Sequence, residues 1–293
     1  MILSSYDVTM EKKLYIIGNG FDKHHGLKTS YWDFRIWLEN HNCVGLIKDM
    51  GTMFPKVVGN NFLLWKDFEM ALGYYDASDI HDVFFQGKDD QWWNEKVQNR
   101  VVDYIKPILI NVREMLKDWI NDIDLDGIKT YVKNIENDVE SMFLTFNYTL
   151  LLERVYYIQR ENICHIHGSI EEDKCITGHN VYNAELQYYN DNVNKEKSVN
   201  NIIALMNTYR KPVNDIIKQH SVFFESLKDI NQVVVYGHSL SSIDMPYFQE
   251  IVNHIGEYKV WRISSHGYDD TDRIKKVFNT YSFRGIECEI FDF

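Results

Sequence analysis

The chain has 293 residues and a formal net charge of −12 at pH 7, with 45% hydrophobic and 25% charged residues. This is the composition of an ordinary globular protein, and it excludes a disordered chain, a collagen and a disulfide-stapled miniprotein. The length suits one large α/β domain, or a core domain that carries a sizeable insertion. Because an acidic surface repels polyanions, nucleic acid is not an expected partner.

The four cysteines, Cys43, Cys164, Cys175 and Cys288, form no CxxC pair. The sequence therefore predicts no four-thiolate zinc site, no other metal site and no disulfide framework. The first residues lack a basic region followed by an apolar one, and no stretch reaches the roughly 18 apolar residues of a membrane span. We expect reduced thiols, a cytoplasmic location and no membrane partner.

Two kinds of sequence alternate along the chain. A short β-rich run at residues 14–17 ends at Gly18, which is typical of a buried strand that leads into a tight turn. From residue 31 to about 140, apolar residues recur every three or four positions, which predicts amphipathic helices. We interpret residues 11–30 and 141–293 as an α/β nucleotide-binding core, and residues 31–140 as a helical insertion or cap.

The second half of the chain returns to strand patterns. Strands are expected at 142–145, 163–166, 232–236, 260–264 and 287–291, with a hairpin partner for the second of these at 175–177. The polar stretch 190–201 is expected to be a mobile loop. Asp244 occupies the position of a helix N-cap, ahead of a helix that runs to about Ile255. The alternation predicts an α/β fold with a Rossmann-like, doubly wound, mainly parallel sheet, whose ligand binds beyond the carboxyl ends of the strands.

The first strand-end motif is IIGNGFDKHHGL, residues 16–27. Gly18 and Gly20 would let backbone amides approach a pyrophosphate without an intervening Cβ atom. The third glycine of the dinucleotide fingerprint is replaced by Lys23, so an ordinary tight turn remains an alternative. Asp22 would either assist at a bound sugar or cap the turn.

Two further motifs follow the next strands. In TFNYT, Asn147 carries an amide that can hold a ribose hydroxyl or a water molecule, or else cap a turn. In CHIHGS, His167 lies at the strand end before Gly168, where an imidazole of near-neutral pKa suits a general base. His165, on the other face of the strand, is expected to be a core or edge histidine.

The fourth motif is YGHSLSSID, residues 236–244. It approaches the GxSxG nucleophile elbow, but Ser241 replaces the last glycine and the helix begins late. A loop of this composition would bind a sugar or a phosphate through Gly237, Ser239 and Asp244. A serine hydrolase that uses Ser239, with His266 as a base, is the alternative reading.

Together the motifs resemble the sirtuin-like NAD-binding superfamily and, within it, the bacteriophage abortive infection AbiH family. The resemblance covers residues 14–35, 142–169 and 232–248. GNGFD followed by Gly26 and Asp33-Phe34-Arg35 is similar to the family's first turn, although the segment before Asp33 is longer. TFNYT is similar to its Thr-x-Asn-x-Asp segment, with Thr149 in place of the acidic residue, and HIHGS and YGHSLSSID are similar to its His-Gly-Ser and Gly-x-Ser-Leu segments.

This resemblance implies an antiviral NAD glycohydrolase, a hydrolase that releases nicotinamide and ADP-ribose. The zinc module of the deacylases is missing, so protein deacetylation is not expected. The implied catalytic residues are His167 and Asn147, and the implied cofactor-binding residues are Gly18, Asn19, Gly20, Phe21, Asp22, Gly168, Gly237, Ser239 and Asp244. NAD is then a substrate or a ligand, and a non-catalytic NAD or ADP-ribose sensor stays open. Because unregulated NAD hydrolysis would harm the host cell, control by a homo-oligomer and by a phage-derived trigger is expected. No sequence feature predicts either of them.

Overall fold

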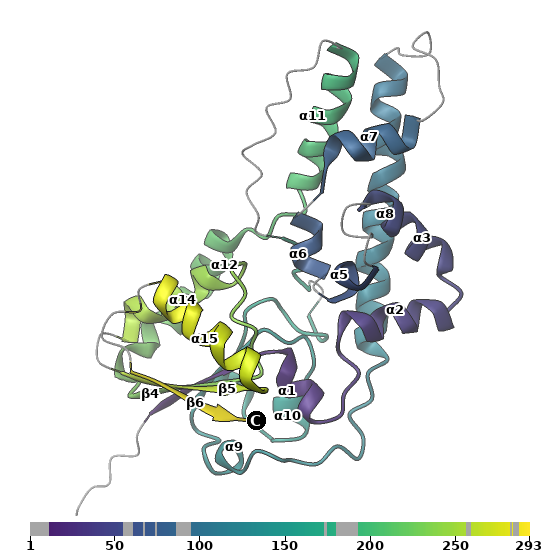
Figure 1. Cartoon of the computed structure of the whole chain (residues 1–293). Coiled ribbons are helices and arrows are strands. Elements are labelled where there is room, and N and C mark those ends of the chain that lie inside the picture. Colours follow the sequence, from purple (N-terminus) through teal and green to yellow (C-terminus); the bar gives the residue numbers. More distant parts are fainter. Residues whose placement is uncertain are drawn as a thin grey trace, which may run out of the picture. The chain divides into compact units, whose positions relative to one another are not determined.

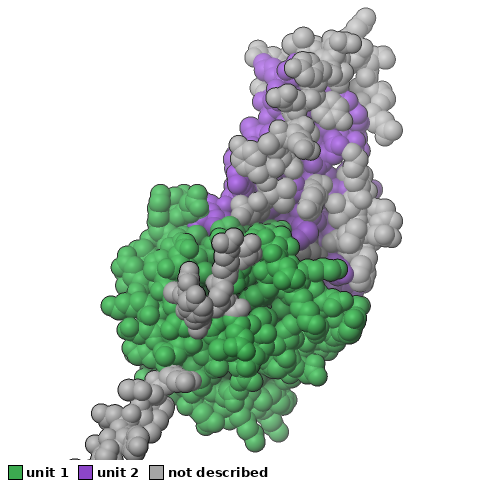
Figure 2. Space-filling model, turned by 60° about the vertical axis from the view of Figure 1, so that its left-hand side comes forward, with its two compact units in different colours: residues 1–27, 125–169, 214–293 green, residues 28–124, 170–213 purple. Residues whose placement is uncertain are grey.

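The computed structural model describes residues 12–54, 61–66, 68–73, 75–85, 95–172, 175–179, 193–255, 259–281, 283 and 287–293. The chain divides into two compact units, which Figure 2 colours separately. Unit 1 comprises residues 1–27, 125–169 and 214–293, and unit 2 comprises residues 28–124 and 170–213. The division into a nucleotide-binding core and a helical insertion stays a prediction.

Unit 1 is built on a six-stranded sheet in which every strand pairing is parallel. The strands are β1 (Lys13–Ile17), β2 (Met142–Thr145), β3 (Ile163–His165), β4 (Gln232–Tyr236), β5 (Val260–Ser265) and β6 (Glu287–Asp292). Their order across the sheet is β3-β2-β1-β4-β5-β6. This is the strand order of the doubly wound Rossmann sheet, and the winding direction reverses between β1 and β4. The predicted α/β class with a parallel sheet is confirmed.

The central strands are buried on both faces. In β1 the last four residues are buried, and β4 has the same pattern. A strand that is covered on both faces needs apolar residues at every position, which explains the runs LYII and VVVY. The edge strand β6 alternates between exposed and half-buried residues. The sheet therefore has its core at β1, β2 and β4, beside the reversal of winding.

The predicted hairpin partner of β3 is wrong. Residues 175–178 form no strand, and the sheet pairing of β3 is with β2. Residues 175–177 instead belong to unit 2, where the nearby His179 bridges Arg210. The segment is thus not part of the sheet that its local pattern indicated.

Helices α14 (Met245–Ile255) and α15 (Tyr268–Thr280) follow β4 and β5 (Figure 1). The start of α14 directly after Asp244 and its end at Ile255 confirm the predicted bounds. The other helical elements of this unit are short: α1 (Asn19–His24), α9 (Lys133–Asn137), α10 (Leu151–Arg154), α13 (Ser221–Glu225) and the 3-10 turns η2 (Arg160–Asn162) and η3 (Ser226–Asp229). Helix α12 (Val213–Gln219) begins at the boundary between the units.

Unit 2 is helical. Among its described residues the helices are α2 (Tyr31–Asn40), α3 (Val44–Met53), α5 (Asn61–Lys66), α6 (Phe68–Gly73), α7 (Ala77–Phe85), α8 (Glu95–Asn121) and α11 (Val193–Asn207). Along α8 the buried side chains recur every three or four residues, at Val101, Ile105, Leu109, Val112 and Leu116. This spacing places them on one face of the helix, which packs against α3 and α11. The predicted helices are therefore confirmed between residues 31 and 121 by α2, α3 and α5 to α8, whereas residues 122–132 form no helix.

The predicted mobile loop at 190–201 is wrong from Val193 onward, because these residues open α11. Ser198 and Val199 are buried, and α11 packs against α7 and α8. Polar residues therefore occupy the outer face of a helix whose inner face is held by its neighbours. Residues 190–192 lie outside the described part of the chain. Within the described residues, no helix combines the length and the apolar content that crossing a membrane requires.

Candidate functional site at the strand ends

Backbone hydrogen bonds bring the four predicted motifs to one edge of the sheet. Gly18 donates to the carbonyl of Tyr236, Phe146 to that of Ile17, and Ile166 to that of Thr145. These bonds tie the loop after β1 to the ends of β4 and β2, and the end of β2 to the segment after β3. The sequence-predicted site residues all belong to unit 1 and lie in the segments that follow β1, β2, β3 and β4. This edge is the carboxyl end of the parallel strands, where ligands of doubly wound sheets bind.

Three glycines pack against one another where the winding reverses. The amide of Gly20 donates to the carbonyl of Gly237 over 2.7 Å. A Cβ atom on Gly18 would lie 2.5 Å from the Cα of His238, and one on Gly237 would lie 2.1 Å from the nitrogen of Phe21. Neither distance is compatible with a side chain. The glycines at these positions are thus required for contact between two protein loops.

This contact changes the predicted role of the β1 loop. The amides of Gly18 and Gly20 donate to the carbonyls of Tyr236 and Gly237. The amide of Phe21 donates to the carbonyl of Gly18. These three amides are therefore engaged within the protein. A pyrophosphate on the loop would require the Gly20 amide to leave its partner. Phe21 itself is fully buried, and its ring packs against those of His25, Tyr156, Tyr236 and Phe293. Asn19, by contrast, is exposed at the start of α1.

Asp22 is the centre of a buried polar cluster. Its carboxylate accepts hydrogen bonds from the amide nitrogen of Asn147, at 2.8 Å, and from the hydroxyl of Thr149, at 2.7 Å. The same Asn147 nitrogen donates to the carbonyl of Gly18. Asp22 is 1% exposed and Asn147 is 6% exposed. Two residues of the β2 loop therefore hold the carboxylate and the β1 loop together.

Burial raises the pKa of Asp22 to about 7. The hydrogen bonds from Thr149 and Asn147, and the charge of His165, oppose this rise by favouring the ionised form. The cost of removing a carboxylate from water is the larger effect. The pKa of Asp22 thus lies near neutral pH, where a carboxyl group can exchange a proton.

His165 extends the cluster along the same side. One ring nitrogen, Nδ1, lies 3.1 Å from the carbonyl oxygen of Asn147, and Nε2 lies 2.8 Å from a carboxylate oxygen of Glu153 on α10. The residue is 3% exposed. The prediction of a core or edge histidine is confirmed, since His165 is buried and belongs to the edge strand β3. The Glu153 and His165 pair fixes the backbone that carries Asn147.

His167 has different neighbours. Its ring lies edge-on to Phe146 at 5.4 Å between ring centroids, and near Tyr247 of α14 at 5.5 Å. It is 3% exposed. The carboxamide of Asn147 contacts Asp22 and Gly18 instead. The two predicted catalytic side chains thus belong to separate clusters. Gly168, with φ of 80°, turns the chain directly after His167.

A second histidine shares this cluster. The ring of His238 lies 4.3 Å from that of Phe146, between centroids. Its Nδ1 accepts a hydrogen bond from the amide of Leu240, so Nε2 carries the proton of the neutral ring. Nε2 lies 3.6 Å from a carboxylate oxygen of Asp244, a predicted binding residue. Asp244 therefore faces an imidazole in this structure, and Phe146 contacts both histidine rings.

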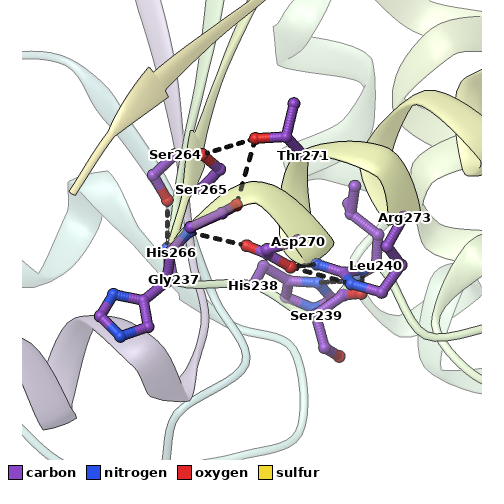
Figure 3. Close-up of polar contacts among 11 residues, drawn as sticks. Gly237, His238, Ser239, Leu240, Ser264, Ser265, His266, Asp270, Thr271 and Arg273 are labelled. Carbon is purple, nitrogen blue, oxygen red and sulfur yellow. Dashed lines mark hydrogen bonds and ion pairs between the residues drawn. The ribbon is translucent and has the colours of Figure 1, made fainter.

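The loop after β4 is also tied to β5 and α15 (Figure 3). The amide of Gly237 donates to the hydroxyl of Ser264, and Arg273 donates to the carbonyl of Ser239 while pairing with Asp270. In Figure 3 the hydroxyl of Ser239 and the ring of His266 point in different directions. Both residues are exposed. This arrangement does not support a serine nucleophile with His266 as its base.

Several residues of the site were not singled out from the sequence. His238, Tyr247 and Glu153 contact the predicted residues, and Ser264 and Arg273 hold the β4 loop. His238 lies inside a predicted motif, so its position beside Gly237 was a usable signal. Glu153 and Arg273 lie on helices among other charged residues, and nothing in their sequence context separates them from a solvated helix face. Within the described residues, no group of three or more His, Cys, Asp or Glu side chains is arranged to hold a metal ion.

The strand order and the strand-end loops define an α/β protein of the doubly wound class, with its polar residues gathered where such folds bind ligands. The family profile described as bacteriophage abortive infection AbiH matches residues 14–265. Since this match covers most of the chain, the protein belongs to the AbiH family. Neither the curated proteins nor the solved structures contain a significant match.

Proposed function

We propose that this AbiH protein acts in abortive infection by binding NAD at the strand ends of unit 1 and hydrolysing it to nicotinamide and ADP-ribose. Membership of the family supports the role in phage defence. The observation that carries the nucleotide proposal is the meeting of the β1 and β4 loops at the reversal of winding, with the β2 and β3 motifs beside them. Ligands of doubly wound sheets bind in this place. The resemblance to sirtuin-like proteins supplies NAD as the candidate.

The reaction would proceed by attack of a water oxygen on C1′ of the nicotinamide ribose. As the new C–O bond forms, the C–N bond breaks, its electron pair returns to the pyridine nitrogen, and nicotinamide leaves as a neutral molecule. Positive charge develops on the sugar in the transition state, as in glycoside hydrolysis. A base must take the proton that the water loses, and this step contributes typically 10²- to 10⁴-fold to the rate.

His167 is the proposed base, and the structure gives it a specific setting. Its ring contacts Tyr247 and Phe146, and Phe146 also contacts His238, which pairs with Asp244. Asn147 takes a positioning role, because its amide holds Asp22 and the Gly18 carbonyl. Asn147 would affect the reaction indirectly, by holding the loop after β1 in its conformation. The pyrophosphate would be accommodated as the Gly20 amide is released from Gly237.

The test is release of nicotinamide by the purified full chain incubated with NAD, followed by chromatography. His167→Gln should reduce the rate at least a hundredfold, while circular dichroism shows the native spectrum. His254→Gln is the matched control, because His254 lies on α14 and is only partly buried. Absence of release by the wild-type protein, without and with phage extract, would contradict hydrolysis. Thermal stabilisation by NAD without release would assign the protein to the sensor class.

A further inference from the structure

Unit 1 contains a hollow that is lined by none of the site residues predicted from the sequence. It has a volume of about 570 Å³ and is lined by His24, Tyr131, Val132, Lys133, Asn134, Tyr236, Phe291, Asp292 and Phe293. These residues come from the end of α1, the start of α9 with the two residues before it, and the ends of β4 and β6. The volume lies within the range of small-molecule sites, roughly 300–1,000 Å³.

Five of the lining residues carry rings. Three of these rings, those of His24, Tyr131 and Phe293, form an aromatic corner in which Tyr131 stands nearly perpendicular to the other two. Phe293, at the C-terminus marked in Figure 1, stacks on His24 with 4.2 Å between centroids and 19° between planes. Tyr131 stands at 86° to the same histidine ring. Phe293 also stacks on the buried ring of Phe21, so a flat ligand would stack on the exposed ring of Tyr131. Tyr131 is 57% exposed, although its ring is one of the largest apolar groups of the unit.

The walls of the hollow are held in place from behind. The buried hydroxyl of Tyr156 accepts hydrogen bonds from the amides of Tyr131 and Val132, and it lies 2.6 Å from Nε2 of His25. The amide of Phe293 donates to the carbonyl of Ser265. A site whose backbone is fixed in this way loses little conformational entropy when a ligand binds.

Polar groups at the hollow complement the edges of a heterocycle. Lys133 is a donor, Asp292 is an acceptor, and Asn134 offers both. The Asn134 side chain also hydrogen-bonds to Tyr236, and burial raises the pKa of that tyrosine, so its hydroxyl remains protonated at neutral pH. One lysine against one aspartate gives no excess positive charge for a chain of phosphates. The net charge of −12 also disfavours nucleic acid.

We infer that this hollow is a second small-molecule site, which binds the planar base of a free nucleoside. The aromatic corner supplies stacking, and the polar groups read the edge of the base. The inference does not depend on NAD cleavage, because a nucleoside has no nicotinamide bond and the measured quantity is binding.

Calorimetric titration of the full chain with adenosine, guanosine, cytidine and uridine tests this site, with ribose as the ligand that lacks a base. At least one nucleoside should bind and ribose should not. Tyr131→Ala should weaken binding about tenfold, the loss typical of removing one aromatic stacking partner, and Tyr131→Phe should restore it. Tyr268→Ala is the control, since Tyr268 is 78% exposed and outside the hollow.

Three outcomes would overturn the inference. The first is absence of binding by all four nucleosides. The second is equal binding by the wild-type protein and Tyr131→Ala, which would place the base elsewhere. The third is tighter binding of a short single-stranded oligonucleotide than of any nucleoside, which would assign the aromatic corner to nucleic acid. Tyr131 is more than half exposed, so its replacement tests the site without emptying the core.

Discussion

The amide of Gly20 and the carbonyl of Gly237 form a 2.7 Å hydrogen bond that joins the loops after β1 and β4 at the reversal of winding in the sheet. The two loops touch through backbone atoms, because none of Gly18, Gly20 and Gly237 has room for a Cβ atom. The contact makes these glycines structural in the state described here. It also determines what has to move if a phosphate is to reach the loop.

Gly237→Ala should therefore destabilise the protein strongly. Gly237 has φ of 63°, and its added Cβ would lie 2.1 Å from the nitrogen of Phe21 and 2.4 Å from the carbonyl carbon of Gly20. We expect a loss of about 3 kcal/mol or more in the free energy of unfolding, measured by urea denaturation. Gly26→Ala is the matched control, with φ of 80° and no atom within 4 Å of the added Cβ. That change should cost about 1 kcal/mol, and equal losses for both variants would refute close packing as the cause.

Asn147→Asp should lower the free energy of unfolding more than Asn147→Ala does, and the difference between the two variants should grow as the pH rises. The carboxamide, whose nitrogen donates to Asp22 over 2.8 Å, would be replaced by a second carboxyl group in a buried site. Two carboxyl groups at this distance share one proton, so the loss of that proton in alkaline solution leaves like charges in contact. Urea denaturation of both variants at about pH 5 and about pH 8 measures the difference. A gap between the two variants that does not grow with pH would contradict the assigned contact.

Asp22→Asn should make the free energy of unfolding less dependent on pH between about pH 4 and pH 7. The pKa of Asp22 is about 7 in the folded protein and 3.8 in the reference state. Between these values the folded chain binds a proton that the unfolded chain has lost, so the free energy of unfolding falls as the pH rises. Above about pH 7 the full cost of the buried charge is present, and below about pH 4 both states are protonated. The difference between the wild-type and Asp22→Asn curves isolates this group, and parallel curves across the window would show that Asp22 does not titrate there.

The architecture of unit 1 was largely predictable, because buried parallel strands leave an unambiguous signal. Runs such as LYII and VVVY are apolar at every position and end at a glycine, so their bounds follow from the sequence. Residues 193–201 were predicted wrongly for the opposite reason. Their polar side chains resemble a loop, and only packing against α7 and α8 makes them a helix. Local composition cannot report a contact with helices that end more than 70 positions earlier in the chain.

The sequence predicted where in the fold the candidate site lies, but it did not predict which side chains contact one another there. The strand-end rule brought Asp22, Asn147 and His167 to one edge of the sheet. It could not tell that Asn147 would bond to Asp22 while His167 would contact Tyr247. Which way a side chain turns after a strand ends depends on loop conformation and on helices elsewhere in the chain. The roles proposed for these residues accordingly remain predictions for experiment.

A buried ion pair in unit 2 gives a prediction that is independent of the strand ends. The ammonium of Lys211 lies 2.9 Å from a carboxylate oxygen of Glu69 on α6, and its side chain is 0% exposed. Glu69→Leu would leave a charged ammonium in the interior without this carboxylate, a change that typically costs about 3–5 kcal/mol. Adding Lys211→Met to Glu69→Leu should recover much of that loss, because both charges are then absent and the volume is nearly kept. Urea denaturation of the wild-type protein, both single variants and the double variant measures the coupling energy. If the double variant is as unstable as the sum of the two single changes, the pair makes no direct contact in solution.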